Sequence, residues 1–144
     1  MPRVKIELPP TFSFQAIIPV RSTDLNYANH VGNDAILSII HEARVQYLQK
    51  FGYGELNFGG TGLIMMDAAI EFKSEILYGQ KILASVGAGE FSKFAFEIFY
   101  KLETENNQKR DLAVIAKTGM VCYDYSARKI VAIPGQVKNK LLNG

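Results

Sequence analysis

The sequence is short of the residues on which disulfides, metal centres and membrane spans depend. Its 144 residues include one cysteine, Cys122, which excludes an internal disulfide and a cysteine-based zinc site. Two histidines among scattered acids give no metal-ligand pattern. No run approaches the roughly 18 consecutive apolar residues of a membrane helix, and the N-terminus has no apolar signal-peptide core. We therefore expect a cytoplasmic protein that spans no membrane and needs no metal or other cofactor.

An excess of charge of one sign is also missing. The net charge is +2 with the histidines neutral, which argues against a dedicated nucleic-acid surface. The Gly-x-Ser-x-Gly elbow of serine hydrolases is absent as well. Hydrophobic residues make up 48% of the chain and charged residues 21%, as in an ordinary folded domain. Neither a repeat nor a linker divides the sequence, so we predict a single domain over residues 1–144.

Hydrophobic periodicity predicts one strand followed by one long helix. Apolar residues at every second position from Phe12 to Val20 indicate a half-buried strand, and Pro19 indicates that this strand is an edge or is ending. A helical pattern follows, with Asn33 as its N-cap and a stop at Gly52. This helix is apolar over most of its circumference, which predicts that it is buried.

The rest of the chain predicts strands, after a glycine-rich and mobile connection at 53–62. The expected strands are 63–72, 82–88, 94–102, 112–125 and 129–133, with a polar, exposed hairpin tip at 103–111. A short helix around 137–142 closes the chain. We therefore predict an α+β domain in which an antiparallel sheet of five or six strands packs on one long helix. A single helix leaves the other face of the sheet uncovered, so we expect an oligomer.

A polar loop leads into the long helix. The loop and helix carry, in order, Asp24-Leu25-Asn26, Asn29-His30-Val31-Gly32-Asn33 and Glu42-Ala43-Arg44. Polar groups at the start of a buried helix can hold an electrophile beside backbone amides, where the helix dipole favours developing negative charge.

The order and spacing of these motifs resemble the hotdog-fold thioesterases of the 4-hydroxybenzoyl-CoA thioesterase type. Those enzymes carry an Asp-x-Asp pair, a Gly-His-Val-Asn-Asn-like loop and a helix with Glu-Ala-Arg. The likeness extends from about residue 12 to 142 and includes the turn Tyr78-Gly79-Gln80. It implies a hotdog fold wrapped around one central helix, and a homodimer or homotetramer with active sites at the subunit interface. It also implies thioesters of coenzyme A or of acyl carrier protein as substrates.

The sequence departs from the family pattern at the second acid of the Asp-x-Asp pair, the usual nucleophile or general base. This residue is Asn26, and an amide has no basic site of useful pKa, although it can orient water or hold the thioester oxygen. Asp24 is either a displaced base or a loop carboxylate that bonds nearby amides. His30 either acts on the thioester or locks the loop onto the helix. Asp67, an acid in an apolar strand that the family places beside the active site, is the third candidate for a replacement base.

We predict that the substrate is bound mainly by the loop and the helix start. The residues expected to contact it there are Tyr27, Gly32, Asn33 and Asp34, with the amides around Gly32 to Asp34 holding the thioester oxygen. Ser92 and Lys93, with Arg128 and Lys129, either bind the phosphates of coenzyme A or are ordinary solvated surface. Arg44 is expected to be a structural partner of other residues.

The sequence thus predicts a thioester hydrolase in which the loop of Asp24, Asn26 and His30 and the helix start assist the attack of water. The alternative is a non-hydrolytic hotdog protein that binds an acyl-CoA or acyl-carrier thioester and has lost the catalytic acid. A dehydratase of the same fold would need a His/Asp or His/Glu pair that is not evident at matching positions.

Overall fold

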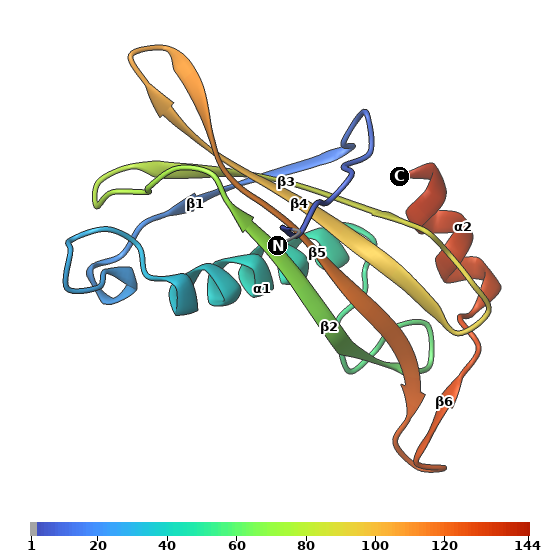
Figure 1. Cartoon of the computed structure of the whole chain (residues 1–144). Coiled ribbons are helices and arrows are strands. Elements are labelled where there is room, and N and C mark those ends of the chain that lie inside the picture. The colour runs from blue at the N-terminus through green and yellow to red at the C-terminus, as the bar shows by residue number, and fades with distance from the viewer. Residues whose placement is uncertain (1–2) are drawn as a thin grey trace.

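A computed structural model describes residues 3–144, and its helices and strands occur in the predicted order. The elements are β1 (Phe14–Pro19), the 3-10 turn η1 (Ser22–Asp24), α1 (Asn33–Lys50), β2 (Gly62–Phe72), β3 (Lys81–Gly89), β4 (Ala95–Asn106), β5 (Lys109–Asp124), β6 (Lys129–Val131) and α2 (Gly135–Asn143). Figure 1 shows a curved sheet with α1 lying across its concave face.

The sheet is antiparallel throughout, with the strand order β1-β3-β4-β5-β2 and β6 added to β5. β1 and β2 are therefore the two ends of this path. Pro19 is the last residue of β1, opposite Lys81, which confirms the prediction of an edge strand that ends near this proline. In β2, the register shifts between Met65 and Asp67, where a bulge adds one residue to the strand.

The helix α1 begins one residue earlier than predicted, because Gly32 and not Asn33 is the N-cap, and Asn33 is the first helical residue. Gly52, at φ +81°, follows the helix end, and the N–H of Tyr53 returns to the carbonyl of Leu48 at 3.0 Å. The predicted glycine stop is therefore confirmed, since a left-handed residue there lets the next amide satisfy a terminal carbonyl.

Only one face of α1 is buried in the single chain. Ile40, Ala43 and Leu48 are completely inaccessible in the core, whereas Leu37 is 40% exposed and its neighbours on the outer side are polar. The prediction of a helix buried over most of its circumference is therefore wrong for the isolated chain. The outer side of α1 remains available to other groups.

Two connections are more regular than the sequence suggests. The segment 53–62 is anchored by Phe58, which is fully buried and stacks on Phe96 at a centroid distance of 5.7 Å. The predicted loop 103–111 is instead a continuation of β4 and β5, joined by a two-residue turn. The turn residues Asn107 and Gln108 have φ values of 52° and 67°, the left-handed pair of a type I′ turn.

The sequence analysis expected the outer face of the sheet to be uncovered, but the structure shows that this face is covered. Residues 3–13 run over this face: the N–H of Ile6 donates to Glu71 Oε2 at 2.7 Å, and the ring of Phe12 lies beside Gly87 and 5.5 Å from Lys101 Nζ. We call residues 3–13 the N-terminal arm. On the concave side, α2 buries Val137 and Leu141 in the same core as α1. Among the described residues, no helix is long and apolar enough to cross a membrane.

Candidate active site

The loop between β1 and α1 is closed by its own backbone. The N–H of Asn26 donates to the carbonyl of His30, and the N–H of Gly32 donates to the carbonyl of Asp24, both at 2.9 Å. Gly32 also leaves room for the first turn of α1, because a Cβ at this position would lie 2.6 Å from Asp34 Oδ1. The loop therefore holds His30 against the start of the helix.

Two of the three amides predicted to bind the thioester oxygen remain free. The amide of Gly32 is occupied by Asp24, whereas no acceptor among residues 3–144 takes the N–H groups of Asn33 and Asp34. The first amides of a helix have no intrahelical partner and lie at the positive end of its dipole. These two amides can donate hydrogen bonds to a negatively charged oxygen of a ligand. Asn33 and Asp34 are both exposed, so a ligand can reach them.

His30 faces a cavity of about 210 Å³ beside this helix start, which is also lined by Asn33, Ser74 and Glu75. Its Nδ1 lies 3.2 Å from the carbonyl of Val31, and its Nε2 lies 3.9 Å from Glu75 Oε1. When Nδ1–H donates to Val31, Nε2 carries the lone pair and can accept a proton. Sequence reasoning missed Glu75, because it comes from the β2–β3 connection and no local pattern joins it to the loop.

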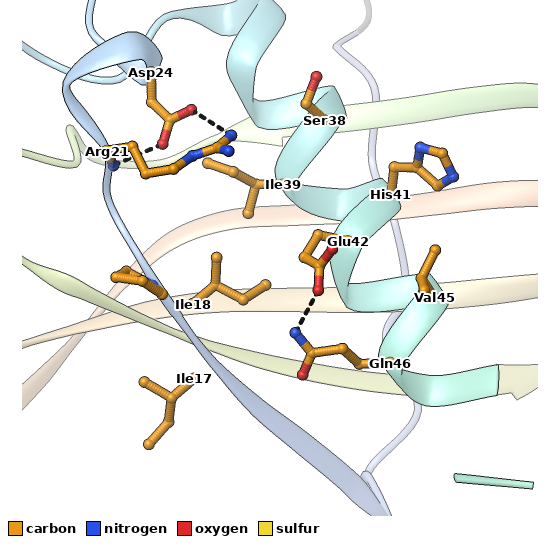
Figure 2. Close-up of a pocket in the computed structure, with 11 residues that line it drawn as sticks. Ile17, Ile18, Arg21, Asp24, Ser38, Ile39, His41, Glu42, Val45 and Gln46 are labelled. Atoms are coloured by element: carbon orange, nitrogen blue, oxygen red, sulfur yellow. Dashed lines mark hydrogen bonds and ion pairs between the residues drawn. The ribbon is translucent and has the colours of Figure 1, made fainter. Parts of the chain in front are cut away.

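Asp24 is buried and bound to its own loop. Its Oδ2 accepts the N–H of Arg21 at 2.8 Å, its Oδ1 accepts Arg21 Nη2 at 3.2 Å, and the residue is 5% exposed. Figure 2 shows this pair at one end of a groove of about 350 Å³ between β1 and α1, with Glu42 bonded to Gln46 farther along the helix. The contacts match the reading of Asp24 as a structural loop carboxylate.

Asn26 and Tyr27 lie on the solvent side of the loop. The Oδ1 of Asn26 accepts the N–H of Ala28 at 2.9 Å, which leaves its second lone pair and the amide NH₂ group for other partners. Tyr27 is completely exposed.

Asp67 lies on the outer face of the sheet, away from α1. Its Oδ1 accepts the N–H of Gly119 at 3.0 Å, and it shares a cavity with Glu90 and Glu97. Met65 faces α1, and strict alternation along β2 would turn Asp67 toward the helix as well. The bulge after Met65 adds one residue, so the side chain of Asp67 points to the outer face instead. Within one chain, Asp67 is therefore not brought to the loop.

Ser92 and Lys93 are also separated from the loop in a single chain. Ser92 closes the β3–β4 turn through bonds with Ala95, and the carbonyl of Lys93 accepts the N–H of Ile133 at 2.9 Å. Figure 1 shows this turn beside β6 and α2, at the end of the molecule away from the loop.

A chain of polar contacts passes from the exposed side of α1 into the core. His41 Nε2 lies 2.6 Å from Glu55 Oε1, and the buried Arg44 donates from Nη1 to the hydroxyl of Tyr100 at 3.2 Å. Tyr100 in turn bonds to Thr118 at 2.7 Å, and its burial raises the pKa of its phenol. Arg44 thus fixes α1 to the sheet, as expected for a structural partner. Within residues 3–144, no cluster of three or more His, Cys, Asp or Glu side chains is placed to hold a metal ion.

A curved antiparallel sheet that wraps a long helix, with a polar loop at the helix start, defines a hotdog-fold protein. A family model described as the thioesterase-like superfamily matches residues 20–141, and the chain belongs to this superfamily. The family resemblance seen in the sequence is thereby confirmed. No curated protein matches the chain by sequence.

Several solved structures are similar to this chain over most of its length. A 1,4-dihydroxy-2-naphthoyl-CoA thioesterase from Synechocystis is 22% identical, with a TM-score of 0.78, over 90% of this chain and 95% of that chain. A DHNA-CoA thioesterase from Staphylococcus aureus is 16% identical, with a TM-score of 0.78, over 90% of each chain. An aspartate-to-asparagine mutant of 4-hydroxybenzoyl-CoA thioesterase has been solved in complex with 4-hydroxybenzoyl-CoA. It is 14% identical, with a TM-score of 0.81, over 89% of this chain and 97% of that chain. These similarities confirm the predicted hotdog fold.

Proposed function

We propose that the protein hydrolyses an acyl thioester to a free acid and a thiol. The observation that carries the proposal is His30 beside the start of α1, in a chain of the thioesterase-like superfamily. Hydrolysis needs a group that takes a proton from water and donors that stabilise the charge on the carbonyl oxygen. His30 Nε2 and the amides of Asn33 and Asp34 are groups of these two kinds.

The proposed reaction begins with the thioester oxygen at the N–H groups of Asn33 and Asp34. Water attacks the carbonyl carbon while His30 Nε2 takes its proton, and the amides stabilise the oxyanion. Collapse of the tetrahedral intermediate breaks the carbon–sulfur bond, and the thiolate leaves with the proton held by His30. Asp24 supports the loop, and the NH₂ group of Asn26 is available to hold water or substrate.

We propose coenzyme A as the carrier of the acyl group. Three structural neighbours with the same fold are described as acting on, or binding, aromatic CoA thioesters. The reaction needs no metal or organic cofactor, because the histidine and the backbone amides supply its acid–base and electrostatic steps.

The active protein is proposed to be a homodimer joined through β2. This edge strand has 11 residues, and Met65, Met66 and Phe72 on it are 36%, 61% and 52% exposed. Met65 also forms a groove with the exposed Leu37 of α1. A long apolar edge strand is a template for pairing, and two copies related by a two-fold axis cover both edges at once.

The test is release of free thiol from a panel of aliphatic and aromatic acyl-CoAs, measured with a thiol reagent. Wild type should be compared with the variants His30→Ala, Asp24→Asn and Asp67→Asn. We expect turnover by wild type and by Asp67→Asn, and a large loss in His30→Ala. Absence of thiol release from every thioester by a folded wild-type protein would refute the proposal.

A second candidate function is thioester binding without hydrolysis. Asn26 stands where the family carries its acid, and its Oδ1 is already bonded to Ala28. The solved complex of the asparagine mutant of 4-hydroxybenzoyl-CoA thioesterase is a case of this fold binding a thioester with one aspartate removed. A rise in melting temperature with acyl-CoA but no turnover, together with turnover gained by Asn26→Asp, would favour this candidate.

A further inference from the structure

A carboxylate from a separate segment lies beside the loop in which Asn26 takes the place of an acid. The cavity of His30 is lined by one acidic residue, Glu75, which belongs to the connection between β2 and β3. Figure 1 shows this connection at the same end of the molecule as the loop before α1. The acids that the sequence suggested as bases are used elsewhere, since Asp24 is bonded within its own loop and Asp67 lies on the outer face of the sheet.

Backbone bonds fix Glu75 beside His30. The carbonyl of Ile76 accepts the N–H of Val31 at 2.8 Å, which joins the connection to the residue that follows His30. On the other side of Glu75, Ser74 is bonded to carbonyls of β5 through its N–H at 3.2 Å and its hydroxyl at 2.9 Å. Because both neighbours of Glu75 are held in this way, its side chain leaves the backbone at a defined place next to the imidazole.

The carboxylate of Glu75 has no structural partner. Its Oε1 lies 3.9 Å from Nε2 of His30, and no donor among residues 3–144 forms a hydrogen bond to it. The nearby Lys73 is paired instead with Glu71 at 3.1 Å, and Glu71 also accepts the N–H of Ile6. Glu75 is therefore available as an acceptor at the mouth of the cavity.

The separation of the two side chains suits a single water molecule. When Nδ1–H of His30 donates to Val31, Nε2 is an acceptor, and the carboxylate of Glu75 is an acceptor as well. A water about 2.8 Å from each atom can donate one hydrogen to Nε2 and the other to Oε1. Atoms 3.9 Å apart subtend roughly a right angle at such a water, close to the angle between its two O–H bonds. The lone pairs of the water oxygen then point away from both side chains.

We propose that Glu75 holds the attacking water together with His30 and takes over the part of the acid that is absent at position 26; this rests on the proposed hydrolysis. The cavity also contains Asn33, whose free N–H is one of the proposed donors to the thioester oxygen. As the bond from water oxygen to carbonyl carbon forms, Nε2 of His30 takes one proton, and the negative charge of Glu75 stabilises the imidazolium. Collapse breaks the carbon–sulfur bond, the thiolate takes the proton from His30, and Glu75 stays ionised throughout.

The experiment measures thiol release from the best substrate of the CoA panel by Glu75→Ala. The control is Glu105→Ala, because Glu105 is an acid of similar exposure, 63% against 70%, on the distant β4–β5 hairpin. We expect kcat to fall about 30-fold in Glu75→Ala with an unchanged KM, and both constants to stay unchanged in the control. Formate should restore part of the activity of Glu75→Ala, because the exposed position is open to a small carboxylate, and it should not affect Glu105→Ala.

A second measurement replaces water by hydroxylamine, a stronger nucleophile that converts the thioester to a hydroxamate. If Glu75 acts on water, Glu75→Ala should form hydroxamate as fast as wild type although its hydrolysis is slow. A wild-type kcat in Glu75→Ala, or an equal loss of hydrolysis and of hydroxamate formation, would overturn the role of Glu75 and leave the proposed hydrolysis in place. Absence of thiol release by folded wild-type protein would refute the proposed hydrolysis, and the role of Glu75 with it.

Discussion

His30 is the residue on which the proposed chemistry depends, and two weak contacts orient it. The carbonyl of Val31 favours the tautomer with Nδ1 protonated, and Glu75 lies 3.9 Å from Nε2, beyond hydrogen-bond distance. The sequence indicated His30 because the loop and the helix start are adjacent in the chain. The local reading of Asp24 as a carboxylate that bonds nearby amides was also available, but the approach of Glu75 was not, since it depends on how separate segments fold together.

The first prediction concerns this side chain. Both His30→Ala and His30→Gln should lower kcat about 100-fold or more, because general-base catalysis contributes factors of that size and glutamine cannot accept the proton. Circular dichroism and the melting temperature serve as controls for folding. Retention of most of the activity by His30→Gln would show that another group activates the water.

Tyr100 gives a prediction for stability. Its hydroxyl connects Arg44 and Thr118 in a fully buried position, so Tyr100→Phe leaves two buried polar groups without this partner. The free energy of unfolding in urea should fall by about 1–3 kcal/mol. The matched control, Tyr125→Phe, removes a hydroxyl from a 55% exposed ring and should change stability little. Equal effects of the two substitutions would contradict the bridging role.

The buried phenol of Tyr47 should make the free energy of unfolding depend on pH in the alkaline range. Burial raises the pKa of its phenol from 10.0 to about 12. Between these values the folded chain holds a proton that the unfolded chain has lost, so the contribution of Tyr47 is complete below pH 10 and declines as pH rises toward 12. The decline has a limit of about 1.4 kcal/mol per pH unit. Urea unfolding between roughly pH 9 and 11.5 should show that the free energy of unfolding declines less steeply in Tyr47→Phe than in wild type. Parallel pH dependences in the two proteins would contradict this role of Tyr47.

At the scale of elements, the order of the strands and helices could be read from the sequence, and their ends less well. Alternation and the glycine stop at Gly52 are local signals, and both were confirmed. The bulge in β2 and the extension of β4 and β5 beyond the core were missed. The polar ladder is exposed at every residue from 105 to 111, so it lacks the alternation that marks a half-buried strand.

The β4–β5 turn gives a prediction at this scale. A type I′ turn needs two left-handed residues, and glutamine, unlike asparagine or glycine, is poorly suited to that conformation. Gln108→Gly should therefore raise the free energy of unfolding by about 1 kcal/mol. Asn107→Gly is the matched control and should gain less, since asparagine already tolerates a positive φ. A loss of stability in Gln108→Gly would mean that the turn has a different geometry.

At the scale of the whole molecule, the two faces of the sheet are covered in different ways. The concave face is filled by α1 and α2, and the N-terminal arm lies over the outer face. Outward residues such as Leu83 and Phe99 are consequently only 8% and 7% exposed. The sequence analysis did not predict this arrangement, although Val4, Ile6 and Leu8 alternate with charged residues, because that run is short and ends at Pro9 and Pro10. An arm on the outer face leaves the edge strands β1 and β2 and the exposed side of α1 for the proposed pairing of subunits.

The arm predicts a difference between two substitutions close together in the sequence. Ile6 is 9% exposed and its N–H is bonded to Glu71, whereas Val4 is 54% exposed. Ile6→Asp places a charge against the sheet and should lower the free energy of unfolding by about 2 kcal/mol or more, while Val4→Asp should have little effect. Release of the arm would also expose Leu83 and Phe99, an apolar patch that promotes association. Light scattering should therefore show a larger mean mass for Ile6→Asp than for Val4→Asp at equal concentration. If urea unfolding and scattering are the same for both variants, the arm does not protect the outer face, and the burial of Leu83 and Phe99 must come from another contact.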